Sequence, residues 1–168
     1  MAERATPEEA VAKAAAFLGE FRTLMLATCG EGGMPDASYA PFVRGRHNVF
    51  YVYVSQLARH TANLSASRQA SVLVIENEDD AREVFARRRL TFRCTAEPIE
   101  RHSSHWDRVM DRFGVQFGEV IEFIRPLEDF VLFALRAESA VFVEGFAQAH
   151  RFEGELLGRL ASINDGGF

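Results

Sequence analysis

The residues best suited to chemistry lie directly after the most apolar run of this chain. The segment from Val49 to Val54 is unbroken and apolar, and it is followed by Ser55 and then by Arg59, His60 and Thr61. The apolar run predicts a buried strand, and the polar segment behind it predicts the start of a helix. Backbone N–H groups at a helix N-terminus are unpaired and carry partial positive charge. The cationic and hydroxyl side chains beside them therefore favour a bound phosphate or carboxylate.

Three consecutive arginines form a second cationic segment. Arg87, Arg88 and Arg89 precede an apolar run that predicts a strand, and strand alternation would point Arg88 away from the other two. One face would then present a cation to an anionic ligand, and the planar guanidinium suits a phosphate or a carboxylate. The alternative is that these arginines form surface or dimer-rim salt bridges with the acidic segment from Glu76 to Asp80.

Histidines are the remaining candidates for binding a metal. His150 follows the last predicted strand, where a neutral imidazole would bind a metal such as iron; the alternative is a surface residue at a strand end. His60 would donate to a phosphate or propionate, or else pair with solvent or a nearby carboxylate. His102 and His105 are three residues apart on one predicted helix, but no third ligand is close in sequence, so they indicate a metal site only weakly.

No general acid–base pair, activated nucleophile or phosphate-binding glycine loop stands out in the sequence. The segment from Gly30 to Gly33 lacks the lysine of a P-loop and predicts a hairpin turn. Any redox chemistry would therefore come from a cofactor, with the protein supplying binding, orientation and electrostatics.

Composition narrows the class of protein further. The chain has 168 residues and a formal net charge of −5, which disfavours a general role in binding nucleic acid. Its two cysteines, Cys29 and Cys94, lie far apart, so a disulfide framework is not expected and a reducing compartment is favoured. Residues 1–9 lack the pattern of a signal peptide, and no apolar run approaches the roughly 20 residues of a membrane span. We expect a cytoplasmic protein that is not bound to a membrane.

The order of predicted elements indicates one domain over residues 1–168, with a helix in residues 1–20 and a short tail in residues 150–168. Thr6, Pro7 and Glu9 predict the start of the first helix, and helical spacing of apolar residues predicts two further helices between 106 and 124. Another helix begins near Leu57. The strands are predicted at Thr23–Cys29, Asp36–Val43, Val49–Val54, Ala70–Ile75 and Leu90–Ala96, with a final pair at Phe130–Leu135 and Ala140–Val143. This order predicts a small antiparallel barrel with peripheral helices.

Several segments, taken in order, carry a family resemblance. They resemble the haem-utilisation proteins of bacteria, which belong to the flavin-binding split-barrel group that includes pyridoxamine phosphate oxidase. The resemblance implies a mainly β fold with peripheral helices, a six-stranded antiparallel split β-barrel, and a homodimer with ligands at the subunit interface. The segments are Ser38–Phe42, Ala58–Leu64, Ala70–Glu76, Ala86–Phe92, Asp129–Phe133 and Gly145–Ala149.

The resemblance also implies site residues. In flavin-binding relatives the strand-to-helix junction contacts the FMN phosphate, and an aspartate at the interface of haem-binding relatives corresponds to Glu122. Those haem-binding relatives carry an iron-ligating histidine close to the carboxyl terminus, where this chain has Gly167. FMN is therefore slightly favoured over haem, and His150 is the nearest substitute for the iron ligand. Together, the resemblance and the residue patterns give these candidate cofactor-binding residues: Ser55, Arg59, His60, Thr61, Asn63, Arg88, Arg89 and Glu122.

Three functions follow from these features. The first is an oxidoreductase of the haem-utilisation type that binds FMN or haem at a dimer interface. The second is a non-catalytic protein that binds or carries haem or flavin on the same scaffold. Pyridoxamine phosphate oxidation is the third and least supported function, because the full pattern of substrate-binding residues is not recognisable.

Overall fold

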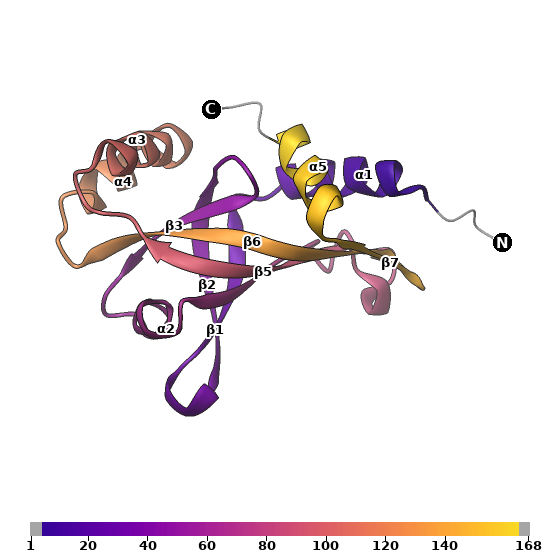
Figure 1. The fold of residues 1–168 in the computed structure, drawn as a ribbon, viewed down its shortest axis with the longest axis horizontal. Helices are drawn as coiled ribbons and strands as arrows, with labels where there is room; N and C mark the ends of the chain where they lie inside the picture. The colour runs from indigo at the N-terminus through magenta and orange to yellow at the C-terminus, as the bar shows by residue number, and fades with distance from the viewer. Residues whose placement is uncertain (1–4, 165–168) are drawn as a thin grey trace.

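The fold is a closed antiparallel barrel, seen in a computed structural model that describes residues 5–164 (Figure 1). The sheet order is β3-β2-β1-β4-β5-β6, and β3 also pairs with β6, which closes the barrel. The predicted six-stranded antiparallel barrel is therefore confirmed. A further strand, β7, extends the sheet beyond β6. The strands are β1 Thr23–Cys29, β2 Pro35–Arg44, β3 Val49–Ser55, β4 Gln69–Ile75, β5 Arg89–Pro98, β6 Phe130–Gly145 and β7 Gln148–Phe152.

The helices lie around the outside of the barrel. Figure 1 draws α1 and α5 together at one end, α3 and α4 on one side of β6, and α2 on the other side. None of the described helices is long and apolar enough to cross a membrane. The helices are α1 Pro7–Gly19, α2 Arg59–Ser67, α3 Ser104–Phe117, α4 Glu119–Ile124 and α5 Gly154–Asn164, with short 3-10 turns η1 at Glu31–Gly33 and η2 at Val84–Ala86.

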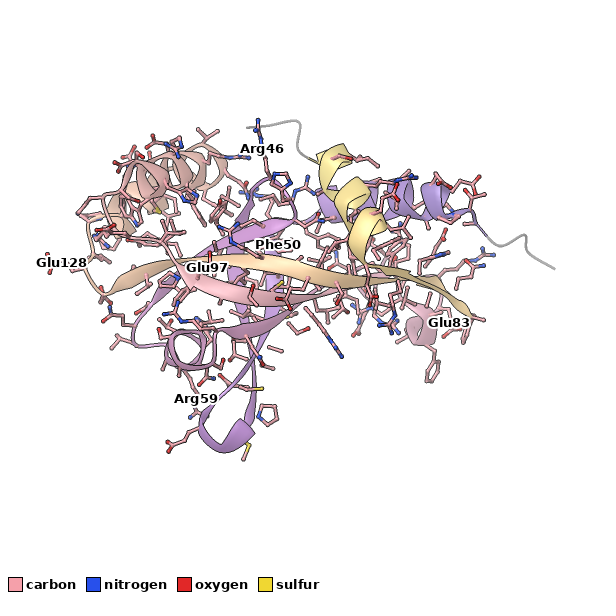
Figure 2. All side chains as sticks on the ribbon, in the orientation of Figure 1. Arg46, Phe50, Arg59, Glu83, Glu97 and Glu128 are labelled. Atoms are coloured by element: carbon pink, nitrogen blue, oxygen red, sulfur yellow. The ribbon has the colours of Figure 1, made fainter. Side chains whose placement is uncertain are left out.

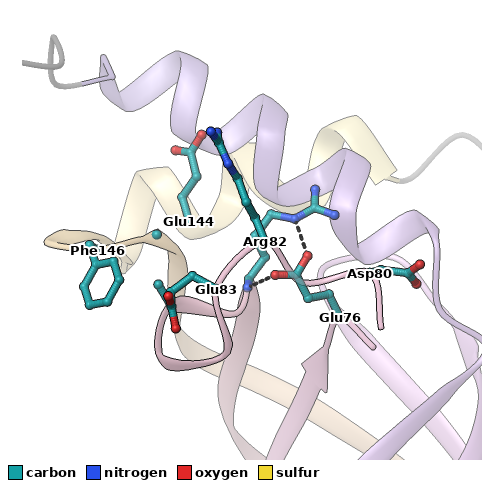
Figure 3. Close-up of a pocket in the computed structure, with 9 residues that line it drawn as sticks. Glu76, Asp80, Arg82, Glu83, Glu144 and Phe146 are labelled. Atoms are coloured by element: carbon teal, nitrogen blue, oxygen red, sulfur yellow. Dashed lines mark hydrogen bonds and ion pairs between the residues drawn. The ribbon is translucent and has the colours of Figure 1, made fainter. Parts of the chain in front are cut away.

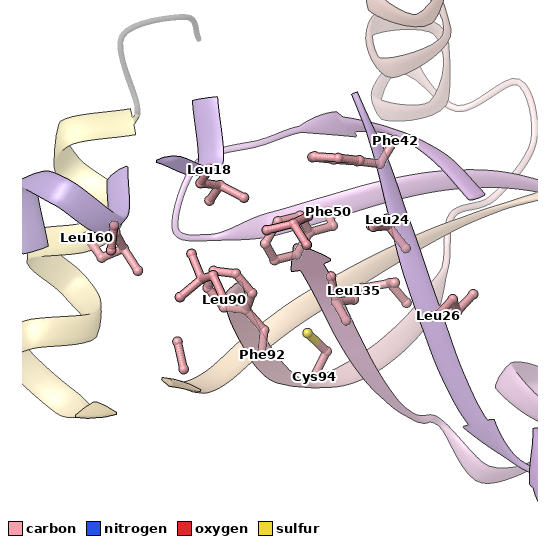
Figure 4. Packing of buried hydrophobic residues seen from close by; sticks show 14 of the residues in the cluster. Leu18, Leu24, Leu26, Phe42, Phe50, Leu90, Phe92, Cys94, Leu135 and Leu160 are labelled. Carbon is pink, nitrogen blue, oxygen red and sulfur yellow. The ribbon is translucent and has the colours of Figure 1, made fainter. Parts of the chain in front are cut away.

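Aromatic side chains fill the centre of the barrel. The rings of Phe50 and Phe92 lie 4.8 Å apart, and those of Phe42 and Phe50 lie 5.6 Å apart (Figure 4). These side chains sit at alternate positions of their strands, which point to one face of a sheet. The barrel interior is therefore a packed apolar core.

Strand β3 is buried on both faces, as its unbroken apolar sequence predicts. Phe50, Val52 and Val54 belong to the barrel core. The alternate residues, which include Tyr51 and Tyr53, pack with α3 and α4 in a second apolar cluster. A strand covered on both sides has no polar face, which explains why its sequence lacks alternation.

The predicted final strand pair is wrong. Phe130–Gly145 forms one strand of 16 residues, and its partner in the last hairpin is β7. The segment between the two predicted strands, 136–139, has no Gly, Pro, Asn or Asp that would favour a turn. Strand β5 pairs along β6 on both sides of a register shift between Arg93 and Cys94, so the long strand continues through an irregularity of its partner.

Candidate functional site

The predicted junction forms between β3 and α2. The chain turns after Ser55, and the backbone N–H of Ala58 donates to Ser55 O at 3.1 Å. Ala58 is the N-cap residue of α2, and no side chain caps the helix from that position. No capping side chain therefore neutralises the positive end of the helix dipole. An anion site requires such an open helix end.

Two charged side chains border this first turn. Arg59 is exposed and extends from α2 at the edge of the molecule (Figure 2). His60 is half-buried, and burial lowers its pKa, although the negative charge of Asp36 acts in the opposite direction. A neutral imidazole keeps one N–H donor, so His60 offers a hydrogen bond to a ligand but little fixed charge at pH 7.

Thr61 and Asn63 also lie at the junction, but their side chains bond within the protein. The Thr61 hydroxyl donates to Ser55 O at 2.6 Å, and Asn63 Nδ2 donates to Thr28 Oγ1 at 2.9 Å. Both residues are buried, with 3% and 6% of their surface exposed. These bonds attach α2 to the barrel. A direct contact of either side chain with a cofactor stays a prediction.

The structural role of Asn63 leads to a testable expectation. Asn63→Ala leaves the hydroxyl of Thr28, itself 3% exposed, without its partner and opens a small cavity. We expect the free energy of unfolding to fall by about 2 kcal/mol, measured by urea unfolding at one protein concentration. Asn77→Ala removes an exposed amide that bonds Asp80 and should change stability by less than about 0.5 kcal/mol. Equal losses in the two variants would contradict this role of Asn63.

Asp129 is a residue of the junction that sequence reasoning did not identify. Ser55 Oγ donates to Asp129 Oδ2 at 3.2 Å and accepts from the backbone N–H of Leu57 at 3.2 Å. The N–H of Gln56 donates to Asp129 O at 2.6 Å. Strand pairing brings Asp129 to this turn: Ser55 pairs with Phe130, so the residue before β6 lies beside the end of β3. That register is visible only in the folded chain.

The three arginines lie elsewhere in the chain and mostly form ion pairs. Arg88 Nε lies 2.9 Å from Glu76 Oε2, and Arg87 Nη1 lies 3.1 Å from Glu78 Oε1. The salt-bridge alternative is therefore confirmed for these two residues. Strand β5 begins at Arg89, so Arg87 and Arg88 precede the strand and the alternation argument does not apply to them. Arg89 Nη1 donates to Arg87 O at 3.0 Å.

Arg88 also lines an open cleft of about 690 Å³ (Figure 3). Its walls carry both signs of charge and include Glu83 and Glu144. Figure 2 labels Glu83 at the end of the barrel opposite Arg59. Within one chain, the cationic residues at the start of β5 are therefore not brought to the junction.

The other two predicted residues are also distant from α2. Glu122 is exposed on α4, which Figure 1 draws on the other side of β6 from α2. His150 lies on β7, where its Nε2 is 3.7 Å from Glu144 Oε2, and Lys13 Nζ lies 2.5 Å from the other oxygen of that carboxylate. His150 is thus a partly buried residue beside the ion pair of Lys13 and Glu144. Gly167 lies outside the described residues.

The outer face of the sheet holds an apolar surface that the sequence did not indicate. Strand register places four side chains side by side across β2, β1, β4 and β5: Tyr39, Met25, Leu73 and Thr91. They line a shallow groove of about 600 Å³. Tyr39 is 56% exposed and Met25 is 50% exposed. We call this row the outer-sheet surface.

Comparison with known proteins identifies similar chains. The family model described as pyridoxamine 5'-phosphate oxidase matches residues 10–144. A curated relative from Vibrio cholerae, named heme oxygenase HutZ, is 41% identical over 150 residues, which cover 89% of this chain and 85% of the relative.

Solved structures give the same picture. The crystal structure of HutZ, described as the heme storage protein from Vibrio cholerae, is 42% identical with a TM-score of 0.72, covering 76% of this chain and 89% of that one. The structure of Campylobacter jejuni ChuZ is 33% identical with a TM-score of 0.77, covering 86% of this chain and 59% of that one. The similarity therefore extends over the barrel and the junction between β3 and α2.

Proposed function

This chain belongs to the pyridoxamine 5'-phosphate oxidase family, and from that membership we propose that it is a haem-utilisation protein acting as an oxidoreductase. It binds haem, with FMN as the alternative cofactor, at the interface of a homodimer. The observation that carries the proposal is the N-terminus of α2, where no side chain caps the helix and Arg59 and His60 border the first turn. The relatives named as heme oxygenase and heme storage protein favour haem over FMN.

The residues at the junction fit the anionic part of either cofactor. A haem propionate or an FMN phosphate would find three kinds of donor here: the guanidinium of Arg59, the imidazole N–H of His60 and the backbone N–H groups of the first turn. The bound cofactor would supply the redox chemistry, and the chain would bind and orient it. His150 Nε2 lies 3.7 Å from Glu144 Oε2, and we assign no residue of this chain as the ligand of haem iron.

A homodimer is supported by the outer-sheet surface. Exposed neighbouring apolar side chains such as Met25 and Tyr39 are typical of a surface that another molecule covers. A second copy would also explain why Arg89 and Glu122 lie away from the junction within one chain. In a dimer, residues from one protomer can complete the site of its partner.

The dimer proposal predicts the effect of one charge on the outer-sheet surface. Leu73→Arg places a guanidinium in the middle of this row, where burial of an unpaired cation is costly. We expect the dimer dissociation constant to rise at least about tenfold, measured by analytical ultracentrifugation over a dilution series. Val115→Arg, at a position on α3 that is 90% exposed, is the matched control and should leave the dimer unchanged. A monomeric wild-type protein at micromolar concentration would contradict the proposal.

The cellular setting belongs to the same proposal. Cys29 and Cys94 are free thiols, which suits a reducing compartment, so we place the protein in the cytoplasm. Its partners are a second copy of itself and a small-molecule cofactor, and neither nucleic acid nor a membrane is among them.

An absorbance spectrum tests the function directly. The spectrum is recorded for the protein as purified and then during separate titrations with haemin and FMN. The haemin titration should produce a Soret band and show micromolar affinity or better. The flavin titration measures the alternative. If neither cofactor binds, the proposal is wrong.

A second candidate is a haem storage or carrier protein without catalysis. It is favoured by the absence of an acid–base pair in the sequence and by the relative described as a heme storage protein. Aerobic incubation of the haem complex with an electron donor separates the two functions. Steady loss of the Soret band with biliverdin-like products indicates an oxygenase, whereas a stable spectrum indicates storage.

A further inference from the structure

A carboxylate lies beside the proposed anion-binding junction. Asp129 is tied to the turn between β3 and α2 twice: its Oδ2 accepts from Ser55 Oγ at 3.2 Å and its backbone carbonyl accepts from Gln56 N at 2.6 Å. A second carboxylate, that of Asp36, is close enough to act on the charge of His60. An anion that binds at the first turn of α2 therefore lies near the carboxylate of Asp129, and the charge of Asp36 acts on the neighbouring His60.

The positive charge available at the junction is modest. Arg59 is exposed, so water screens its charge. His60 is half-buried, and burial lowers its pKa, so it is largely neutral at pH 7. The N-terminus of α2 adds about half an elementary charge. Together, Arg59, His60 and the N-terminus of α2 balance a ligand with one negative charge better than a ligand with two.

The hydroxyl of Ser55 already donates its proton within the protein. A hydroxyl has one proton to donate, and that of Ser55 points to Asp129. A phosphate oxygen placed against Ser55 Oγ would therefore face an acceptor and a nearby carboxylate, with no proton between them. A phosphate monoester needs several donors around its three oxygens and carries between about 1.5 and 2 negative charges at pH 7. A carboxylate has two oxygens and one charge.

We infer that Asp129 determines which anion the junction accepts: it favours the singly charged carboxylate of a haem propionate and disfavours the phosphate of FMN. The inference rests on the proposed function and names the ligand class for the same site. Asp129 acts through Ser55 and through its own charge.

Two pairs of ligands isolate the contribution of each anionic group. Riboflavin is FMN without the phosphate, and haemin dimethyl ester is haemin with its carboxylates masked. In the wild-type chain, FMN and riboflavin should bind within about threefold of one another, whereas haemin should bind clearly tighter than its ester. Fluorescence titration measures the flavins, and absorbance titration measures the porphyrins.

Asp129→Asn removes the charge and keeps an acceptor for Ser55. The ratio of the riboflavin to the FMN dissociation constant should rise about fivefold, as expected for one charge a few ångströms away near water. The ratio of the haemin dimethyl ester to the haemin dissociation constant should change by less than about twofold. Glu128→Gln is the matched control, because it removes one charge from the neighbouring position, which Figure 2 shows extending away from the barrel. It should leave both ratios unchanged.

Ser55→Ala provides a second variant if Asp129→Asn does not fold. It keeps the carboxylate of Asp129 charged and frees it from its partner, so the riboflavin to FMN ratio should not rise. If the wild-type chain and the variants bind the cofactors but Asp129→Asn leaves the flavin ratio unchanged, the inference is wrong and the proposed function stands. If the wild-type chain binds neither haemin nor FMN, both are wrong.

Discussion

Replacing Arg59 and His60 together with alanine is expected to weaken haemin binding by about fiftyfold. The double variant removes one full cation and one N–H donor from the first turn of α2 and leaves the backbone donors in place. A charge-assisted hydrogen bond contributes about 1.5 to 3 kcal/mol when shielded and less at an exposed position such as Arg59. Absorbance titration with haemin measures the change, and the same experiment with FMN measures the alternative cofactor.

Two variants show whether the loss is specific to the junction. Arg46→Ala removes an exposed arginine that Figure 2 places on the other side of the barrel, and it should leave the affinity within about twofold. Restoring a cation with Arg59→Ala and His60→Lys should recover part of the binding. If the double alanine variant binds haemin as well as the wild-type chain does, the cofactor binds elsewhere and the junction is structural.

Phe92→Ala is expected to lower the free energy of unfolding by about 4 kcal/mol. Phe92 is fully buried, and its ring lies 4.8 Å from that of Phe50 in the centre of the barrel. Truncation removes buried apolar surface and leaves a cavity that the closed sheet cannot collapse to fill, because strand pairing holds the walls in place. Urea unfolding at a single protein concentration measures the loss, since dimerisation would make stability depend on concentration.

An exposed position gives the comparison. Val115→Ala on α3 removes methyl groups from a side chain that is 90% exposed, so the free energy of unfolding should change by less than about 0.5 kcal/mol. If Phe92→Ala were as mild as this control, the aromatic centre of the barrel would be loosely packed.

The boundaries of the early strands could be predicted because local signals mark them. The prediction Thr23–Cys29 matches β1, and Ala70–Ile75 differs from β4 by one residue. Both are apolar runs that end at polar or glycine-rich turns, and strand and turn preferences are local properties. The continuity of β6 could not be predicted in this way. It depends on pairing with β5 and β3, which are distant in sequence.

The same distinction holds within the candidate site. The junction after Ser55 was predictable because an apolar run followed by Arg59 and His60 is a local pattern. The sequence could not predict which of these side chains remain free to bind a ligand. Thr61 and Asn63 have suitable polar groups, but these groups form hydrogen bonds to the barrel. The arginines before β5 are a similar case, because their carboxylate partners belong to another loop.

The sequence by itself therefore determined most of the strands and helices and the place of the turn between β3 and α2, because these depend mainly on neighbouring residues. Only the tertiary structure decided how that turn is charged. Asp129 reaches Ser55 because the first residue of β6 pairs with the last residue of β3, 75 positions earlier in the chain. Electrostatic interactions act through space, so the charge around this turn depends on the strand register that brings the carboxylate of Asp129 to Ser55.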